Sequence, residues 1–446
     1  MNPPEPVERF SAIGRGPVAR SRRGARRAPA GFTPVCAAAG AILSTLIGAM
    51  TVDTARAQSA SAFEAPPVML ASEALPESMV VGPDHRVENF VYNDGSINTY
   101  QVTSTFGRAA VRSTPLLSLR IEEVRALRRL EQLAATDAYQ SAREAAMQGP
   151  LREQKRLIVG DPTTGTGPPS GVGTFFGGEA MVSGVPGGES VTATATRFDA
   201  YKRAFAYAAQ LNPYSRFNAV QQNLREFAWN CFAGELSVDD AFAAIATAPI
   251  QPRRVSSFED AVDRRIRDES PGRLRERNIE MLAGMEVNEA VARLLQSESR
   301  YTPVAKTVIT EALGRMNGVA DRQVFVERAS LIGETEMAHL IQGWSTLLAG
   351  YHENIEPVAR MVRVAQVPFL LTSSGKLVGV FAMDLLVWTP ETARALGRIS
   401  DSVARIEGVK ARELWFSGRV TPITRDNLEE RGWKVVEEAG ERLRLR

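Results

Sequence analysis

The side chains with the clearest chemical potential in this chain are Glu336 and His339. A glutamate three residues before a histidine shares its face of a helix, and helix bundles that bind two iron ions use this spacing. Such a site needs a second Glu-x-x-His, and the sequence contains none. His352 and Glu353 could join a metal-dependent or hydrolytic site only if the chain turned near Gly350, because 13 helical residues separate the histidines by roughly 20 Å. The candidate catalytic residues are therefore Glu336, His339, His352 and Glu353.

The chain contains no sequence motif for the other common reaction chemistries. A serine hydrolase of the α/β type would carry Gly-x-Ser-x-Gly, and a dinucleotide enzyme would carry a glycine-rich turn after a strand, but the sequence contains neither. Cys231 shares a predicted helix face with Val220 and Leu224, so we expect a packed, unreactive thiol. His85 lies in a polar stretch and is expected at the surface. The sequence therefore predicts no metal site and no cofactor, and it favours a protein that is not an enzyme.

Residues 1–57 have the features of a signal peptide. A cluster of arginines precedes an uncharged stretch at residues 35–52, and Ala55 and Ala57 fit the small pockets of signal peptidase. Cleavage is predicted before Gln58, which would place the mature protein in the periplasm or outside the cell. The alternative is a retained N-terminal membrane anchor, since 18 uncharged residues reach the lower limit for a spanning helix.

The charge balance of the chain depends on this segment. The whole chain has a formal net charge of +2, and loss of residues 1–57 removes eight arginines and three acidic residues, which leaves about −3. A chain with this balance has no strong positive field to attract nucleic acid. We therefore expect no nucleic-acid partner, and the sequence leaves the oligomeric state open.

The first part of the mature chain is predicted to contain a β-meander and one long helix. Residues 58–78 are rich in Ala, Pro and Ser and are interpreted as a linker. In residues 79–148, three short apolar runs separated by Asp94-Gly95 and a second glycine turn predict antiparallel strands. Thr114-Pro115 is typical of a helix start, and apolar residues at helical spacing predict an amphipathic helix that continues to Met147.

A segment rich in glycine and proline, residues 149–196, follows the predicted helix. It combines few charges with large apolar side chains, whereas a flexible linker is expected to be polar. These side chains either pack on the protein's own core or contact a protein partner or a membrane surface. The candidate contact residues are Val172, Phe175, Phe176, Met181, Val182 and Val185.

The rest of the chain predicts an α-helical domain at residues 197–365 and a small α/β module at residues 366–446. Proline and glycine interrupt the helical periodicity of the first, as at Thr302-Pro303, which favours helices of modest length. The second has the order β-β-α-β-α-β, with helix starts at Thr389-Pro390 and Thr421-Pro422. The predicted fold class is therefore α+β, mostly helical, with a small mixed sheet at the C-terminus.

Short motifs in the chain include Tyr100-Gln101-Val102, Arg120-Ile121-Glu122-Glu123 and Gly418-Arg419-Val420. In these motifs the chain resembles exported bacterial proteins that have no assigned activity. The resemblance implies no activity, cofactor or site residue. We therefore predict an exported, non-enzymatic interaction or scaffold protein of the bacterial envelope or periplasm. The alternative is an exported metal-dependent or hydrolytic enzyme that uses Glu336 and His339.

Overall fold

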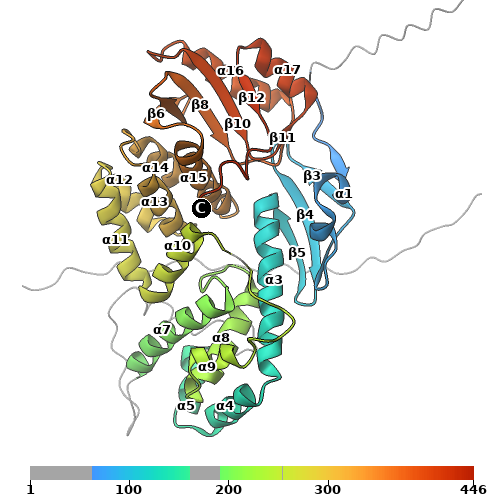
Figure 1. Cartoon of the computed structure of the whole chain (residues 1–446), viewed down its shortest axis with the longest axis vertical. Coiled ribbons are helices and arrows are strands. Elements are labelled where there is room, and N and C mark those ends of the chain that lie inside the picture. The colour runs from blue at the N-terminus through green and yellow to red at the C-terminus, as the bar shows by residue number, and fades with distance from the viewer. Residues whose placement is uncertain (1–62, 161–190, 254) are drawn as a thin grey trace, which may run out of the picture. The chain divides into compact units, whose positions relative to one another are not determined.

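The computed structural model describes residues 63–160, 191–253 and 255–446 (Figure 1). All the elements described below belong to one compact unit, Ser61–Arg446. Most of the regular structure in the described residues is helical and the strands form small sheets, so the predicted α+β, mostly helical class is confirmed. No helix among these residues is long and apolar enough to cross a membrane.

An antiparallel sheet begins the described chain. β3 (Phe90–Asn93), β4 (Asn98–Ser104) and β5 (Gly107–Arg112) form the predicted meander, in which β4 pairs with both of the others. Gly95 has a φ of 108° in the turn between β3 and β4, a conformation that favours glycine. β2 (His85–Val87) also pairs with β4. The strands predicted in this region are therefore confirmed.

The linker predicted at residues 58–78 is wrong for the part that the structure describes. β1 (Val68–Leu70) pairs antiparallel with β3, and α1 (Ala71–Ala74) and α2 (Glu77–Val80) follow it. A strand of three residues carries too little pattern to stand out in a sequence. Its state is decided by pairing with a more distant segment, which local composition does not reveal.

The chain before β1 is anchored to the C-terminal module, residues 366–446. The carboxylate of Glu64 accepts a hydrogen bond from the Trp388 amide at 2.9 Å and another from the Thr421 hydroxyl. The backbone N–H of Glu64 donates in turn to the Trp388 carbonyl at 2.9 Å. The start of the described chain is therefore held by residues that lie more than 300 positions later.

The single helix predicted up to Met147 is wrong, because the structure has two helices there. α3 (Thr114–Ala134) starts at the predicted Thr-Pro pair. α4 (Asp137–Gln148) starts after Thr136, whose hydroxyl accepts a hydrogen bond from the Tyr139 amide. Apolar residues recur at helical spacing in both helices, so periodicity alone does not reveal the break between them.

Helices α3 and α4 share an apolar core with the next helices of the chain. These are α5 (Arg152–Ile158), α7 (Val191–Ala209), α8 (Asn218–Ala233) and α9 (Val238–Ala243). The loop boundaries predicted at residues 149–196 are wrong at both ends, because α5 and the start of α7 occupy the described flanks. α5 has only two turns, too few for a clear periodicity. Cys231 in α8 is fully buried, and burial raises the pKa of its thiol to about 12, as expected for an unreactive thiol.

A second apolar core joins six further helices. These are α10 (Ser257–Asp268), α11 (Pro271–Gly284), α12 (Glu289–Ser297), α13 (Pro303–Arg315), α14 (Gln323–Ser330) and α15 (Met337–Asn354). α13 starts at the predicted cap, where the Thr302 hydroxyl accepts a hydrogen bond from the Ala305 amide. The modest helix lengths predicted for this region are confirmed.

The C-terminal module contains a mixed sheet with the strand order β12-β10-β8-β7-β6. Its strands are β6 (Val358–Val364), β7 (Val367–Thr372), β8 (Lys376–Phe381), β10 (Ala411–Phe416) and β12 (Lys434–Val436). β8, β10 and β12 are parallel, and α16 (Pro390–Val403) and α17 (Pro422–Glu430) connect them, so the predicted order is confirmed. The predicted helical domain ends too late, at residue 365, because β6 follows α15 directly and pairs with β7.

Helices cover both faces of this sheet (Figure 1). Along β7, Leu370 packs into the core of α10 to α15, whereas Phe369 and Leu371 pack with α16 and α17. This alternation is expected for a strand that is buried on both faces. Two short strands, β9 (Leu385–Leu386) and β11 (Arg419–Val420), form a separate parallel pair. The loop from β8 to β9 reaches the N-terminal sheet and makes the polar contact described below.

Candidate functional sites

The structure does not bring the predicted catalytic residues together. α15 continues through Gly350, so the chain does not turn there and His339 and His352 lie on separate turns of one helix. Glu336 precedes the helix and its side chain is exposed. The Nδ1 atom of His352 accepts a hydrogen bond from the Val358 amide at 3.0 Å. The turn that a shared site requires is therefore absent from α15.

Gly350 and Glu353 both have structural explanations. The C-terminal segment crosses α15 at Gly350, since a Cβ atom there would lie 1.7 Å from the Leu443 carbonyl oxygen. Glu353 forms a two-point ion pair with Arg315, with N–O distances of 2.6 and 3.1 Å. Within the described residues, no group of three or more His, Cys, Asp or Glu side chains is placed to hold a metal ion.

His339 and His85 are both packed into the fold. His339 is hydrogen-bonded to the Pro115 backbone, and burial together with the charge of Arg120 lowers the pKa of its ring to about 4. The ring is therefore neutral at pH 7. The prediction that His85 lies at the surface is wrong, because its side chain is buried and its Nε2 atom lies 3.1 Å from the Met79 carbonyl oxygen. His85 has polar neighbours in the sequence, so the sequence does not reveal that its side chain faces inward from β2.

Two predictions concern parts of the chain outside the described residues. One is the signal peptide at residues 1–57. The other is the contact surface in the glycine-rich segment, formed by Val172, Phe175, Phe176, Met181, Val182 and Val185. Both stay predictions.

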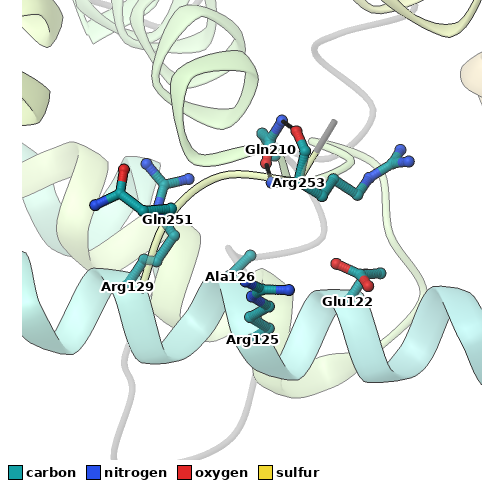
Figure 2. Close-up of a pocket in the computed structure, with 7 residues that line it drawn as sticks. All are labelled: Glu122, Arg125, Ala126, Arg129, Gln210, Gln251 and Arg253. Carbon is teal, nitrogen blue, oxygen red and sulfur yellow. Dashed lines mark hydrogen bonds between the residues drawn. The ribbon is translucent and has the colours of Figure 1, made fainter. Parts of the chain in front are cut away.

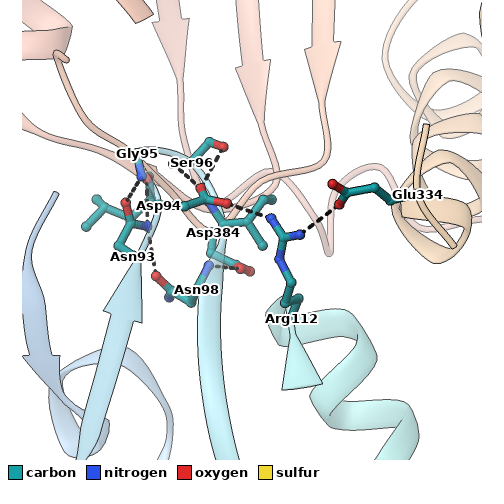
Figure 3. A network of polar contacts seen from close by, with 10 residues as sticks. Asn93, Asp94, Gly95, Ser96, Asn98, Arg112, Glu334 and Asp384 are labelled. Carbon is teal, nitrogen blue, oxygen red and sulfur yellow. Dashed lines mark hydrogen bonds and ion pairs between the residues drawn. The ribbon is translucent and has the colours of Figure 1, made fainter. Parts of the chain in front are cut away.

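A polar network joins the N-terminal sheet to the C-terminal module (Figure 3). Asp384, in the loop from β8 to β9, accepts hydrogen bonds from the backbone N–H groups of Asn98 at 2.9 Å and Thr114 at 3.0 Å. Its two carboxylate oxygens thereby hold the first residues of β4 and α3. Burial raises the pKa of Asp384 in spite of these hydrogen bonds. Asn93 adds a hydrogen bond to the Leu385 carbonyl at 3.1 Å.

Arg112 forms the outer part of the same network (Figure 3). Its guanidinium contacts Asp94 at 2.8 Å and Glu334 at 3.2 Å. Deeper in the network, the hydroxyls of Tyr100 and Thr114 lie 2.6 Å apart, and burial raises the pKa of Tyr100 to about 12. Each carboxylate of the network already receives a hydrogen bond. We therefore interpret the network, called the Asp384 clasp below, as a connection between two parts of the fold.

One face of the N-terminal sheet exposes large apolar side chains. Direct cross-strand neighbours on β1 and β3, Val68 with Tyr92 and Leu70 with Phe90, point away from the core. Val91, between the two aromatic residues, faces inward and is fully buried. The four outward side chains are called the β1–β3 patch. Val68 is 57% exposed, Tyr92 54%, Leu70 45% and Phe90 58%.

A small recess lies between α3 and the segment that leads into α10 (Figure 2). Its lining residues are Glu122, Arg125, Ala126, Arg129, Gln210, Gln251 and Arg253. Arg129 extends from α3 towards Gln251 and is 7% exposed. Its Nε and Nη1 atoms are buried and have no hydrogen-bond partner among the described residues. The side chain of Gln210 donates to the Arg253 carbonyl at 2.9 Å and accepts from the Arg253 N–H at 2.7 Å, which fixes the opposite wall.

A more open groove of about 430 Å³ lies beside β6 and is lined by Arg360, Arg363 and Arg405. All three arginines are exposed, in contrast to Arg129. Asp321 and Glu407 line the same groove, so its charges are largely balanced. Unlike the recess, this groove contains no buried charge that requires a partner.

The sequence analysis missed both Arg129 and the β1–β3 patch. Arg129 lies three residues after Ala126 and four before Leu133, which are both buried, so it falls in the apolar stripe of α3. A charged residue inside such a stripe is a sequence feature from which Arg129 could have been identified as a candidate. The patch offers none, because apolar residues in short strands have the same pattern whether or not another element covers them.

Comparison with protein-family models, with curated proteins and with solved structures finds no significant match to this chain. The predicted resemblance to exported bacterial proteins is therefore neither supported nor contradicted. Two features of the described residues remain as candidates for function: the exposed β1–β3 patch and the recess beside Arg129.

Proposed function

We propose that this chain is an exported, non-enzymatic interaction protein of the bacterial envelope, and that the β1–β3 patch contacts its protein partner. The observation that carries the proposal is the patch itself, in which two aromatic and two aliphatic side chains are direct cross-strand neighbours and each is about half exposed. Single exposed apolar residues are ordinary on protein surfaces. A contiguous group that includes aromatic residues is typical of protein interfaces.

The face of the sheet is a better contact than its edge. Among the described strands, β1 pairs with β3 alone, which leaves its other edge without a strand. β1 is only three residues long, however, and it follows Pro66 and Pro67, which have no N–H to donate. Short strands and prolines are common means of preventing edge pairing. We therefore assign the contact to side chains of the β1–β3 patch.

Charged side chains near the patch indicate what kind of partner to expect. Arg86 and Arg108 both stand opposite Thr103 of β4, so they lie on the same outer face as Tyr92, which stands opposite Thr99. Both arginines are exposed. Charges at the rim of an interface select partners with complementary charge. Glu73, whose carboxylate accepts a hydrogen bond from the Leu70 N–H, and exposed Glu88 also border the patch, so we expect an apolar partner surface with charges of both signs at its rim.

Export and the lack of an enzymatic activity complete the proposal. Export is supported by the arginine cluster, the uncharged stretch and the small residues before Gln58. The non-enzymatic part is supported by Asp384 and Glu353, whose carboxylates are already engaged by N–H groups of the fold. The metal-dependent or hydrolytic alternative stays a prediction, and no geometry among the described residues favours it.

Site-specific photocrosslinking in the native host tests the contact. A photoreactive phenylalanine in place of Tyr92 should give a discrete protein adduct. The same group in place of Leu331, an isolated apolar residue that is 71% exposed, should give none. Leu70→Thr with Phe90→Thr should reduce the adduct at position 92 by roughly 10-fold or more, because aromatic residues carry much of the energy of interfaces. The melting temperature should change little, since both side chains are exposed.

Two results would contradict the contact. Equal protein adducts at positions 92 and 331 would show unspecific encounter, and adducts with lipid alone would assign the patch to a membrane surface. Fractionation of the same strains tests export separately. The tagged full-length protein is expected in the periplasm or the medium, and its recovery only from the cytoplasm would contradict export.

A further inference from the structure

We propose that the recess beside Arg129 is a binding site for a small anionic group, a carboxylate or a phosphate. The site belongs to α3 and to the segments that follow α7 and precede α10. It shares no residue with the β1–β3 patch, so this inference goes beyond the proposed function and can fail or succeed independently of it.

The buried guanidinium of Arg129 is the main reason for the assignment. An arginine side chain stays charged at every physiological pH, and buried charges in proteins are almost always paired and hydrogen-bonded. Arg129 has two buried N–H groups without a partner among the described residues. The ring of Phe242, 5.8 Å from the guanidinium carbon, is its only cation–π contact in the described part of the chain. An anionic oxygen in the recess would supply an acceptor to one of these two nitrogen atoms, because Nε–H and the Nη1 hydrogens point to different edges of the guanidinium.

Neighbouring charges increase the attraction for an anion. Arg125 lines the same recess, as does Arg253, whose guanidinium is already paired with Glu259 at 3.5 Å. Burial and the charge of Arg125 both lower the pKa of Arg129. Glu122 is the one acidic side chain in the lining, and no ion pair joins it to Arg129 in the part of the chain that the structure describes. The recess is therefore positive overall.

The shape of the recess limits what it can bind. The free space of the recess amounts to only about 10 Å³. This is room for one oxygen atom. We therefore expect the ligand to bring one oxygen to Arg129 and to remain at the mouth with its other atoms, near Arg125. The Gln210 side chain donates one hydrogen bond to the Arg253 backbone and accepts another from it, so one wall is in place before the ligand arrives.

Thermal unfolding of the full chain with added anions tests the inference. Sodium phosphate and sodium acetate are titrated separately, each against sodium chloride at the same ionic strength. A ligand that binds only the folded protein raises the melting temperature in a saturable way, and we expect this from at least one of the two anions. The anion that gives the rise distinguishes a phosphate site from a carboxylate site. Arg129→Met should abolish the rise.

Two further variants keep the test decisive. Arg143→Met removes an exposed arginine of α4 and the same charge, so this control should keep the rise. Arg125→Gln changes an exposed side chain at the mouth, should fold normally, and should weaken the apparent affinity by about 10-fold, as expected for one lost charged contact. The inference is overturned if Arg129→Met keeps the rise, if chloride reproduces it at equal ionic strength, or if neither anion produces one.

Discussion

Replacement of Arg129 by methionine should make the protein more stable when no anion is bound. Arginine and methionine both place a flexible, unbranched stem in the apolar stripe of α3, so methionine keeps most of the packing. The substitution removes a buried charge that has no hydrogen-bond partner at its Nε and Nη1 atoms among the described residues. Binding sites typically retain residues that lower the stability of the protein, so replacement of such a residue should raise the free energy of unfolding.

The expected gain is about 1–2 kcal/mol in the free energy of unfolding. Apolar residues that replace buried charged groups of similar volume often stabilise proteins by about 1–4 kcal/mol. The lower half of this range applies to Arg129 for two reasons. Its third guanidinium nitrogen is not among the buried atoms without a partner, and the ring of Phe242 gives partial compensation at 5.8 Å.

Urea unfolding in a chloride buffer without phosphate or carboxylates measures this gain. Arg129→Met should move the midpoint to higher urea without a change in the slope, because the surface exposed on unfolding is the same. Arg143→Met, at an exposed site, should stay within about 0.5 kcal/mol of the wild type. A loss of stability of about 1 kcal/mol or more in Arg129→Met would refute the reasoning, because it would show that Arg129 already has a favourable partner in the folded protein.

Three further predictions follow from buried groups elsewhere in the fold. Burial raises the pKa of Asp263 to about 6. Ionisation of this carboxyl therefore lowers the free energy of unfolding of the protein as the pH rises from about 4 to 6. In paired urea titrations Asp263→Asn should therefore gain roughly 1–3 kcal/mol over the wild type at pH 8 and almost nothing at pH 4. Gly234→Ala should lower the melting temperature and cost about 1–3 kcal/mol, because its Cβ would lie 2.0 Å from the Ala142 carbonyl oxygen, whereas Gly272→Ala, with open space around its Cβ, should not. Elemental analysis should find the same metal content in the wild type and in His339→Ala, and a stoichiometric metal lost with the histidine would restore the metal-dependent alternative.

Helix starts were predictable from the sequence because their causes are local. Thr302-Pro303, Thr389-Pro390 and Thr421-Pro422 each begin a helix, and each threonine hydroxyl accepts a hydrogen bond from the amide three residues later. A cap of this kind depends on four consecutive residues, so the sequence contains everything that decides it. The predicted order of the C-terminal module followed from two such starts and from the apolar runs between them.

Features that depend on distant residues were not predictable in the same way. β1 is a strand because β3 lies beside it, and β6 is a strand because β7 pairs with it. Neither segment is distinguished by its own composition. The candidate recess follows the same rule. The sequence places Arg129 in an apolar stripe, but only the arrangement of α3 against the chain around Gln210 and Gln251 shows that no acceptor reaches its Nε and Nη1 atoms in the described structure.

The hydrogen bonds of Glu64 and the Asp384 clasp also affect the order in which parts of the fold can form during synthesis. Glu64 and Asn98 leave the ribosome early, whereas their partners Asp384 and Trp388 are made near the end of synthesis. Contacts between such distant segments form slowly, because a long loop must close before they bring any gain. The strands of the N-terminal sheet pair with one another, but the connections of this sheet to the C-terminal module cannot form until almost the whole chain has been made. For the exported protein that we propose, these connections would therefore form only after the last segment has crossed the membrane.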